Sequence, residues 1–138
     1  MDIGAQYRRY ISYLNEGRVH DLSDFVHEEL IYNDEPMTRA DYQNYIADDF
    51  ARIPDLHFDI HQLIVSDNHV ASRIRFNCTP EADFRGHAPN GQKISFVEHV
   101  FYQFENGKIR QVWSLLDDRA IHAQMEKEKT IKVNEGSK

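Results

Sequence analysis

Cysteine and long apolar segments are the two features that this sequence most clearly lacks. Its 138 residues contain one cysteine, Cys78, so no disulfide bond can form within the chain. No apolar run approaches the roughly 20 residues that a membrane-spanning helix needs. The first ten residues, MDIGAQYRRY, lack the apolar core of a signal peptide. We therefore expect a soluble, cytoplasmic protein that folds without disulfide bonds.

Basic residues are also scarce. The chain has 16 Lys and Arg against 23 Asp and Glu, a formal net charge of −7, and the basic residues form no cluster. This charge disfavours nucleic acid and anionic membranes as partners. The segment from Gly86 to Gly91 is not followed by Lys-Ser or Lys-Thr, so it does not predict a phosphate-binding loop.

The length fits a single domain, which we place at residues 1–126. A chain of 138 residues buries about two-thirds of its unfolded surface, enough for a core and a pocket. Residues 127–138 lie in the charged segment EKEKTIKVNEGSK, which contains no aromatic residue. We expect this C-terminal tail to be disordered.

Apolar residues at helical spacing predict three helices in the first half of the chain. The first covers residues 3–14 and ends near Gly17, a residue suited to a helix C-cap. The second covers residues 21–30. The third begins at Thr38, which opens an approximate capping box, and ends before Pro54.

After the third helix the apolar period changes to two, which is typical of β-strands. This alternation predicts strands near residues 56–61, 70–76, 93–104 and 109–116, after a short strand at 31–33. The dipeptide Asn106-Gly107 predicts a type I′ hairpin, because both residues tolerate positive φ. Helices followed by antiparallel strands indicate an α+β domain with the helices packed on one face of a curved sheet.

Asp117 is the first candidate functional residue, because it ends a run of residues that should be largely buried, Val112 to Leu116. A carboxylate in such a place must be solvated, paired or used for chemistry. As a catalytic group, it would be kept with a raised pKa and would take up or release a proton. As an N-cap, it would begin a helix through residues 119–122.

His99 is the second candidate and lies in the middle of the strand FVEHVFYQF. A lone histidine in such a strand is more often a core residue than a catalyst. Counting pairs outward from the Asn-Gly turn places His99 opposite Ser114. Three residues should then share the face of Ser114: His99, Phe101 and Gln103. Trp113 and Asp117 fall on the other face, so a joint site of Asp117 and His99 requires that a β-bulge or the end of the strand turns Asp117 inward.

The order of three segments along the chain resembles that in the SnoaL-like polyketide cyclases of the NTF2-like superfamily. The segments are PDLHFDIHQLIVSDNHV, FRGHAPNGQKISF and FYQFENGKIRQVWSLLD. The resemblance extends over roughly residues 3–125. The matching positions are Pro54-Asp55-Leu56, Gly86, Pro89, Gly91, Gly107-Lys108-Ile109, Trp113 and Asp117.

The resemblance implies an NTF2-like cone, in which the N-terminal helices pack on a curved, mostly antiparallel sheet around one dominant pocket. It implies that Asp117 is the acid/base group of an aldol closure, a reaction that needs no metal or cofactor, and that His99 or Gln103 would bind the developing oxyanion. Candidate contacts for a small apolar carbonyl substrate are Gln103, Trp113, Asn33 and Phe101. It also implies a homodimer formed through the outer face of the sheet.

The sequence departs from the family pattern at two places. Gln103 stands where relatives often have a basic residue, and Cys78-Thr79-Pro80 replaces a common Gly-Thr-His segment. The substrate therefore stays open, and a non-catalytic module that binds a small apolar ligand or only dimerises is the alternative. A hydrolase with a carboxylate–Arg–carboxylate relay has three arginines available: Arg73, Arg75 and Arg110.

Four other polar residues have simpler interpretations. Glu98 is either a second carboxylate of the site or an exposed strand residue, and we favour exposure. Asn33 precedes Asp-Glu-Pro and is most simply a turn former. His57 and His61 lie on one strand face without a nearby third ligand, so an exposed polar face is favoured over a metal site.

Overall fold

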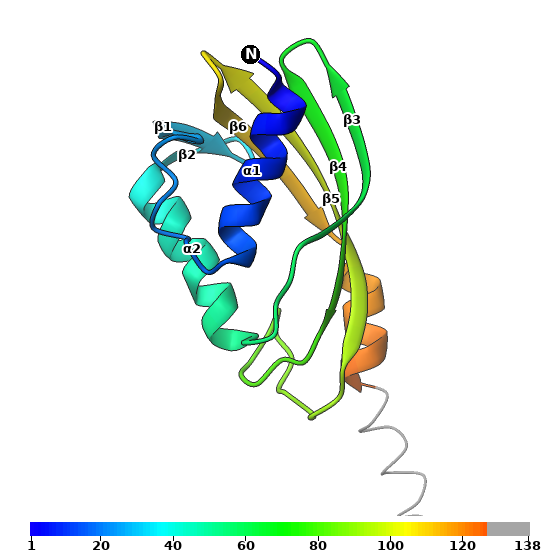
Figure 1. The fold of residues 1–138 in the computed structure, drawn as a ribbon. Helices are drawn as coiled ribbons and strands as arrows, with labels where there is room; N and C mark the ends of the chain where they lie inside the picture. Colours follow the sequence, from blue (N-terminus) through cyan, green and yellow to red (C-terminus); the bar gives the residue numbers. More distant parts are fainter. Residues whose placement is uncertain (127–138) are drawn as a thin grey trace, which may run out of the picture.

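The computed structural model describes residues 1–126, and the predicted disordered tail at 127–138 lies outside these residues. Within them the chain forms three helices and one six-stranded sheet (Figure 1). In chain order the elements are α1 (Ile3–Asn15), β1 (Val26–Tyr32), β2 (Glu35–Thr38), α2 (Arg39–Arg52), β3 (Asp59–Ser66), β4 (His69–Cys78), β5 (Ile94–Glu105), β6 (Lys108–Leu116) and a helix over residues 118–126. No helix in this described part is long and apolar enough to cross a membrane.

Both N-terminal helices begin at capping residues. The Asp2 carboxylate accepts a hydrogen bond of 3.0 Å from the first turn of α1, and the Thr38 hydroxyl accepts one of 3.1 Å from the backbone of Asp41 in α2. α2 ends at Arg52, just before Pro54. The first and third predicted helices are therefore confirmed.

The predicted helix over residues 21–30 is wrong, because residues 23–25 form a turn and β1 follows directly. Four apolar residues of this segment are all buried: Leu22, Phe25, Val26 and Leu30. The spacing of these four residues would place them on one face of a helix, but a buried turn followed by a half-buried strand buries the same four side chains. The pairing of β1 with both β2 and β6 stabilises the strand.

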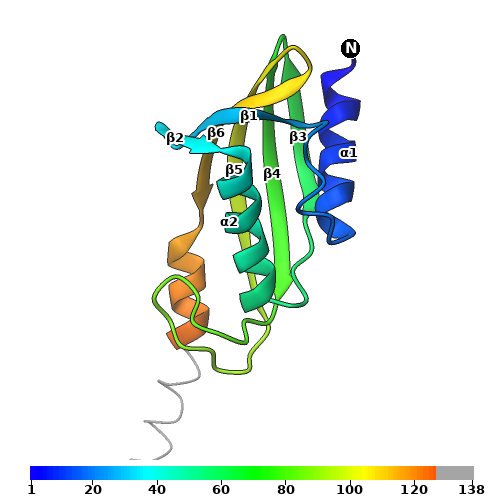
Figure 2. The same cartoon turned by 90° about the vertical axis from the view of Figure 1, so that its left-hand side faces the viewer.

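The sheet has the strand order β2-β1-β6-β5-β4-β3, and β1 with β6 is the one parallel pair among these strands. This confirms the predicted curved, mostly antiparallel α+β fold. Helices α1 and α2 lie over the same face of the sheet, as Figure 2 shows. On that face Tyr7 and Tyr10 of α1 contact Tyr102 of β5, with ring centroids 4.9 and 6.1 Å apart.

A β-bulge in β6 changes the register that the sequence predicted. Phe104 pairs with Ile109, but Gln103 pairs with Gln111, which leaves Arg110 as an extra residue. The predicted pairing of Gln103 with Arg110 is therefore wrong. Beyond the bulge, each side chain of β6 points to the face opposite to the one expected, because strand side chains alternate with a period of two.

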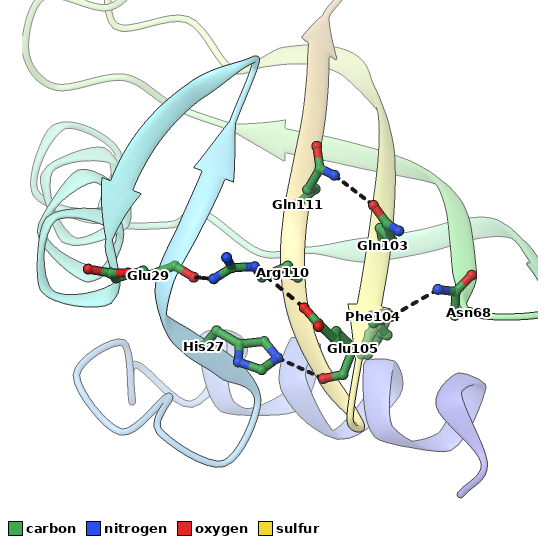
Figure 3. A network of polar contacts seen from close by, with 8 residues as sticks. All are labelled: His27, Glu29, Asn68, Gln103, Phe104, Glu105, Arg110 and Gln111. Atoms are coloured by element: carbon green, nitrogen blue, oxygen red, sulfur yellow. Dashed lines mark hydrogen bonds and ion pairs between the residues drawn. The ribbon is translucent and has the colours of Figure 1, made fainter.

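The side chain of Arg110 leaves the hairpin and reaches the neighbouring strand, as Figure 3 shows. It donates a hydrogen bond to the carbonyl oxygen of Glu29 in β1 and forms an ion pair of 3.5 Å with Glu105. Just beyond it, the Gln111 amide donates to the Gln103 amide oxygen at 2.7 Å. These contacts hold the bulge and tie the hairpin to β1.

Two strand pairs define the faces that result from the bulge. Val100 pairs with Ser114, and both are buried on the inner face. Phe101 pairs with Trp113 on the outer face, where Phe101 is 59% exposed. The predicted grouping of Ser114 with His99 and Phe101 is therefore wrong, and Ser114 lies on the face that the helices cover.

Candidate active site

A cavity of about 510 Å³ lies between the helices and the inner face of the sheet. The volume is within the range of about 300–1,000 Å³ that is common for small-molecule sites. Much of its lining is aromatic or aliphatic, including Tyr10, Tyr42, Phe58, Phe76, Phe96 and Val100. Helix α2 presents Tyr42, Tyr45 and Asp49 to it because these residues, three, four and seven positions apart, share one face of the helix.

Glu98 is a carboxyl group in the wall of this cavity. It lies in the middle of β5, and the hydroxyl of Ser114 in β6 donates a hydrogen bond to its Oε2. Burial, with a smaller contribution from the Asp49 carboxylate, raises the pKa of Glu98 from its ordinary value of 4.5 to about 7, against the opposing effects of Ser114 and Arg85. Near neutral pH both protonation states of Glu98 are therefore populated.

Asp49 is a second carboxyl group in the lining. Burial raises its pKa from 3.8 to about 6, although Arg52, 3.8 Å away, and Arg85 act in the opposite direction. Arg85 also lines the cavity, and it is held in place by two hydrogen bonds to the carboxylate of Asp118. The lining thus contains four carboxyl groups, those of Asp48, Asp49, Asp83 and Glu98, and two cations, Arg52 and Arg85.

Tyrosine hydroxyls provide neutral hydrogen-bond donors in the same cavity. The hydroxyls of Tyr10 and Tyr42 lie 2.6 Å apart in a buried hydrogen bond. Tyr32 of β1 also lines the cavity, and burial raises its pKa well above the ordinary value, so its hydroxyl keeps its proton. Carboxyl groups that titrate near neutral pH beside neutral donors can move protons to and from a bound molecule.

Asp117 lies at the end of β6 and outside the cavity lining. Its carboxylate accepts a hydrogen bond of 3.0 Å from the backbone of Ala120, so it caps the helix over residues 118–126. Its own backbone N–H donates to the carbonyl of Val97. The side chain is exposed. The capping interpretation is confirmed, while a catalytic role for Asp117 stays a prediction that this position does not favour.

The structure places His99 and Trp113 on the outer face of the sheet, away from Glu98. Arg73 of β4 donates to Nε2 of His99 at 2.6 Å. The indole N–H of Trp113 donates to Asp34 at 3.3 Å. His99 is exposed, and neither it nor Trp113 lines the cavity.

The remaining predicted site residues are also outside the lining. Phe101 and Gln103 share the outer face with His99. Asn33 has φ of 48° in the tight turn between β1 and β2, and its amide exchanges hydrogen bonds with the backbone of Ser114. The turn interpretation of Asn33 is therefore confirmed. Of the arginines, Arg52 and Arg85 line the cavity rather than the three that the sequence offered for a relay.

Glu98 lines the cavity, although from the sequence we favoured an exposed position for it. One signal could have found it. Glu98 shares its parity with every large apolar residue at an even position of this strand, namely Ile94, Phe96, Val100, Tyr102 and Phe104. A carboxylate on the apolar face of a strand is the unusual feature, because burying it costs free energy unless it is paired or used.

Comparisons with known proteins agree with this architecture. The model of the family described as SnoaL-like polyketide cyclase matches residues 5–125. A crystal structure of a SnoaL-like polyketide cyclase from Agrobacterium tumefaciens is 38% identical, with a TM-score of 0.86, over 90% of this chain and 98% of that one. A search of curated proteins found no match.

Two more distant solved structures share the fold. AclR from Streptomyces galilaeus, named as a candidate hydroxylase, is 20% identical with a TM-score of 0.76, over 91% of this chain and 96% of its own. IdmH from Streptomyces antibioticus, named as a candidate polyketide cyclase, is 16% identical with a TM-score of 0.79, over 90% of this chain and 98% of its own. At these identities the likeness concerns the fold alone.

Proposed function

Because this chain belongs to the SnoaL-like polyketide cyclase family, we propose that it catalyses an intramolecular aldol cyclisation or an isomerisation of a small apolar carbonyl compound by acid/base chemistry without a cofactor. The observation that carries the proposal is Glu98, a carboxyl group with a pKa of about 7 inside an aromatic cavity. A general base or acid works best when its pKa lies near the operating pH.

In the proposed reaction the ionised Glu98 removes a proton from a carbon next to a carbonyl group, which gives an enolate and a protonated Glu98. The enolate carbon then attacks a second carbonyl carbon of the same molecule and forms a C–C bond. The electron pair of that C=O bond moves to its oxygen, which takes the proton from Glu98. No atom is gained or lost, so no co-substrate is needed. An isomerisation uses the same two proton transfers without the new C–C bond.

The negative charge that develops on the enolate oxygen needs hydrogen-bond donors in a largely water-free site. Tyr32 and Tyr45 line the cavity, and each carries a hydroxyl suited to this role. Arg85 is a cation in the same lining, and it lowers the pKa of both Glu98 and Asp49, so its field reaches both carboxyl groups. The aromatic walls favour a largely apolar substrate, in which the carbonyl groups are the polar part.

We also propose that the chain forms a homodimer through the outer face of the sheet. A row of four residues crosses this face on neighbouring strands: Ile64, Ala71, Phe101 and Trp113. Ile64 and Phe101 are 56% and 59% exposed. Burying such a row against a second copy removes apolar surface from water, which favours association.

The proposal is tested with a probe whose reaction needs only the first proton transfer. A small aromatic ketone such as 1-tetralone is incubated with the protein in D₂O, and mass spectrometry measures deuterium at the carbon next to the carbonyl. We expect the wild-type chain to accelerate exchange, with a rate that rises through about pH 7 as Glu98 ionises. Glu98→Gln should lower this rate by about 10²–10⁴-fold.

The matched control is Glu28→Gln, which changes an exposed glutamate of β1 and should leave the rate unchanged. Ketone binding is measured separately by calorimetry. Binding without exchange in the wild type would overturn the catalytic proposal in favour of a ligand-binding module. An exchange rate in Glu98→Gln equal to that of the wild type would show that Glu98 does not take the proton.

A further inference from the structure

Three potential metal ligands meet at the end of the sheet opposite to the N-terminus. They are His87, in the loop of residues 79–93 between β4 and β5, and His122 and Glu126, on the helix over residues 118–126. Figures 1 and 2 both show this loop beside that helix. One ligand atom from each of the three side chains lies within 4.8 Å of the other two.

Local structure holds His87 in place. Phe84 and His87 exchange two backbone hydrogen bonds of 2.9 Å across a tight turn, in which Arg85 and Gly86 have φ of 48° and 85°. These two φ values are those of a type I′ turn, where glycine is favoured because it has no Cβ. His87 therefore leaves the turn in a fixed direction, toward the helix.

The loop and the helix are tied together on both sides of His87. Before it, Arg85 donates two hydrogen bonds to Asp118, in the first turn of the helix. After it, Asn90 donates to the carbonyl of Met125 at 2.9 Å. These contacts fix the position of one ligand relative to the other two, so a bound ion would not have to bring distant elements together.

The two potential ligands on the helix, His122 and Glu126, are spaced so that both can reach one ion. His122 and Glu126 are four residues apart, so their side chains lie on the same face, one turn from each other. The Nδ1 atom of His87 lies 3.2 Å from Oε1 of Glu126, and the ring centroids of His87 and His122 are 5.0 Å apart. Tetrahedral zinc with bonds of about 2.0–2.1 Å places its ligand atoms roughly 3.3 Å apart. The His87–Glu126 separation meets this value, and rotation of the exposed His122 can bring its ring nitrogen closer.

We propose that His87, His122 and Glu126 bind one divalent transition-metal ion of the zinc class. Two imidazoles and one carboxylate select zinc and similar ions over calcium or magnesium, which prefer oxygen ligands alone. The three ligands leave a fourth position for water. None of these three described side chains lines the cavity, so the ion has no part in the reaction proposed above.

The bound ion would fix the loop that forms part of the cavity wall. Phe84, Arg85 and Gly86, directly before His87, all line the cavity. An ion that joins His87 to the helix would restrain these residues. The site therefore couples the presence of the metal to the rigidity of the cavity wall near Arg85.

The test uses the full chain, freed of metal with a chelator and then titrated with Zn²⁺ in competition with a chromogenic chelator. We expect one tight site per chain. Since loss of an outer-shell partner alone typically weakens metal binding about 10–100-fold, His122→Ala should weaken it by at least about 100-fold. The control is His57→Ala, which removes an exposed histidine of another segment and should leave the affinity unchanged.

A second measurement reports on the loop. Trypsin should cut after Arg85 more slowly when Zn²⁺ is present in the wild type, and at the same rate with or without Zn²⁺ in His122→Ala. Circular dichroism checks that each variant is folded, and His122→Gln replaces His122→Ala if that variant does not fold. Equal zinc affinity in the wild type and the folded His122 variant, or no binding by the wild type, would overturn the proposal.

Discussion

Glu98→Gln should stabilise the protein above neutral pH while it removes the proposed acid/base group. Gln has the same shape as Glu and can still accept the hydrogen bond that Ser114 donates. It has no charge to bury. The pKa of Glu98 is raised from 4.5 to about 7, chiefly by burial. At about 1.4 kcal/mol per pH unit, the ionised form of Glu98 costs the folded state about 3.5 kcal/mol.

The sign of this effect follows from proton binding in the two states. Below about pH 4.5 the carboxyl group is protonated in both the folded and the unfolded chain, and it contributes nothing to the pH dependence. Between about 4.5 and 7 the unfolded chain loses the proton while the folded chain keeps it, so the free energy of unfolding falls as pH rises. Above about pH 7 the penalty is complete.

Urea denaturation of the wild type and Glu98→Gln at several values between pH 4.5 and 8.5 measures this penalty. The difference in the free energy of unfolding between them should grow with pH and reach about 3.5 kcal/mol in favour of Gln. Asp49 adds a similar pH dependence to both curves, and the comparison largely removes it. A constant difference across the range, or a Gln variant that is less stable at pH 8, would refute the assignment of Glu98 as a buried carboxyl group with a raised pKa.

Three further predictions concern residues outside this carboxyl group. Asp117→Ala should lower the free energy of unfolding by about 1 kcal/mol in thermal denaturation, and Asp117→Asn should leave it almost unchanged, because Asn caps a helix about as well as Asp. Both variants should keep the activity of the wild type. A large loss of activity in Asp117→Asn would instead support a catalytic role for Asp117. Tyr10→Phe should cost about 1 kcal/mol in urea denaturation, because it removes the buried hydrogen bond to Tyr42. Phe101→Glu should weaken the proposed homodimer at least tenfold in analytical ultracentrifugation, roughly 1.4 kcal/mol; a wild type that is monomeric at micromolar concentration would contradict the dimer.

Structural features that depend on residues close together in the chain could be predicted from the sequence. Thr38 caps α2 because its hydroxyl reaches a backbone N–H three residues away. Asn106 and Gly107 form the expected hairpin, with φ of 52° and 78°. The end of β1 overlaps the strand predicted at residues 31–33, but its first part could not be predicted in the same way. Its neighbour β6 lies about 80 residues later in the chain, and no pattern within residues 21–30 indicates that pairing.

The candidate site was harder to predict than the fold. The expected residues Asp117 and His99 were assigned faces by counting from the hairpin, and that count assumed strict pairing. Arg110 breaks the count, and the contacts that accommodate it, with Glu29 of β1, come from a distant segment. Glu98 lies in β5, and its inward direction was visible in the alternation of that strand alone. The wrong face of Ser114 therefore came from the register between strands, whereas the choice of His99 over Glu98 overlooked the alternation within β5.

The same bulge decides what surrounds the carboxyl group of Glu98. With strict pairing, Trp113 would point to the inner face and Ser114 to the outer one, because each residue beyond the hairpin would be turned over. An indole ring would then occupy inner-face space next to Glu98, and the carboxyl group would lose the hydroxyl that donates to it. With Arg110 inserted, the small Ser114 lies inside and the indole lies outside, in contact with Asp34. One extra residue thus leaves room for a cavity beside Glu98 and also supplies the hydrogen bond that orients its carboxyl group, which explains why a bulge stands next to the candidate site.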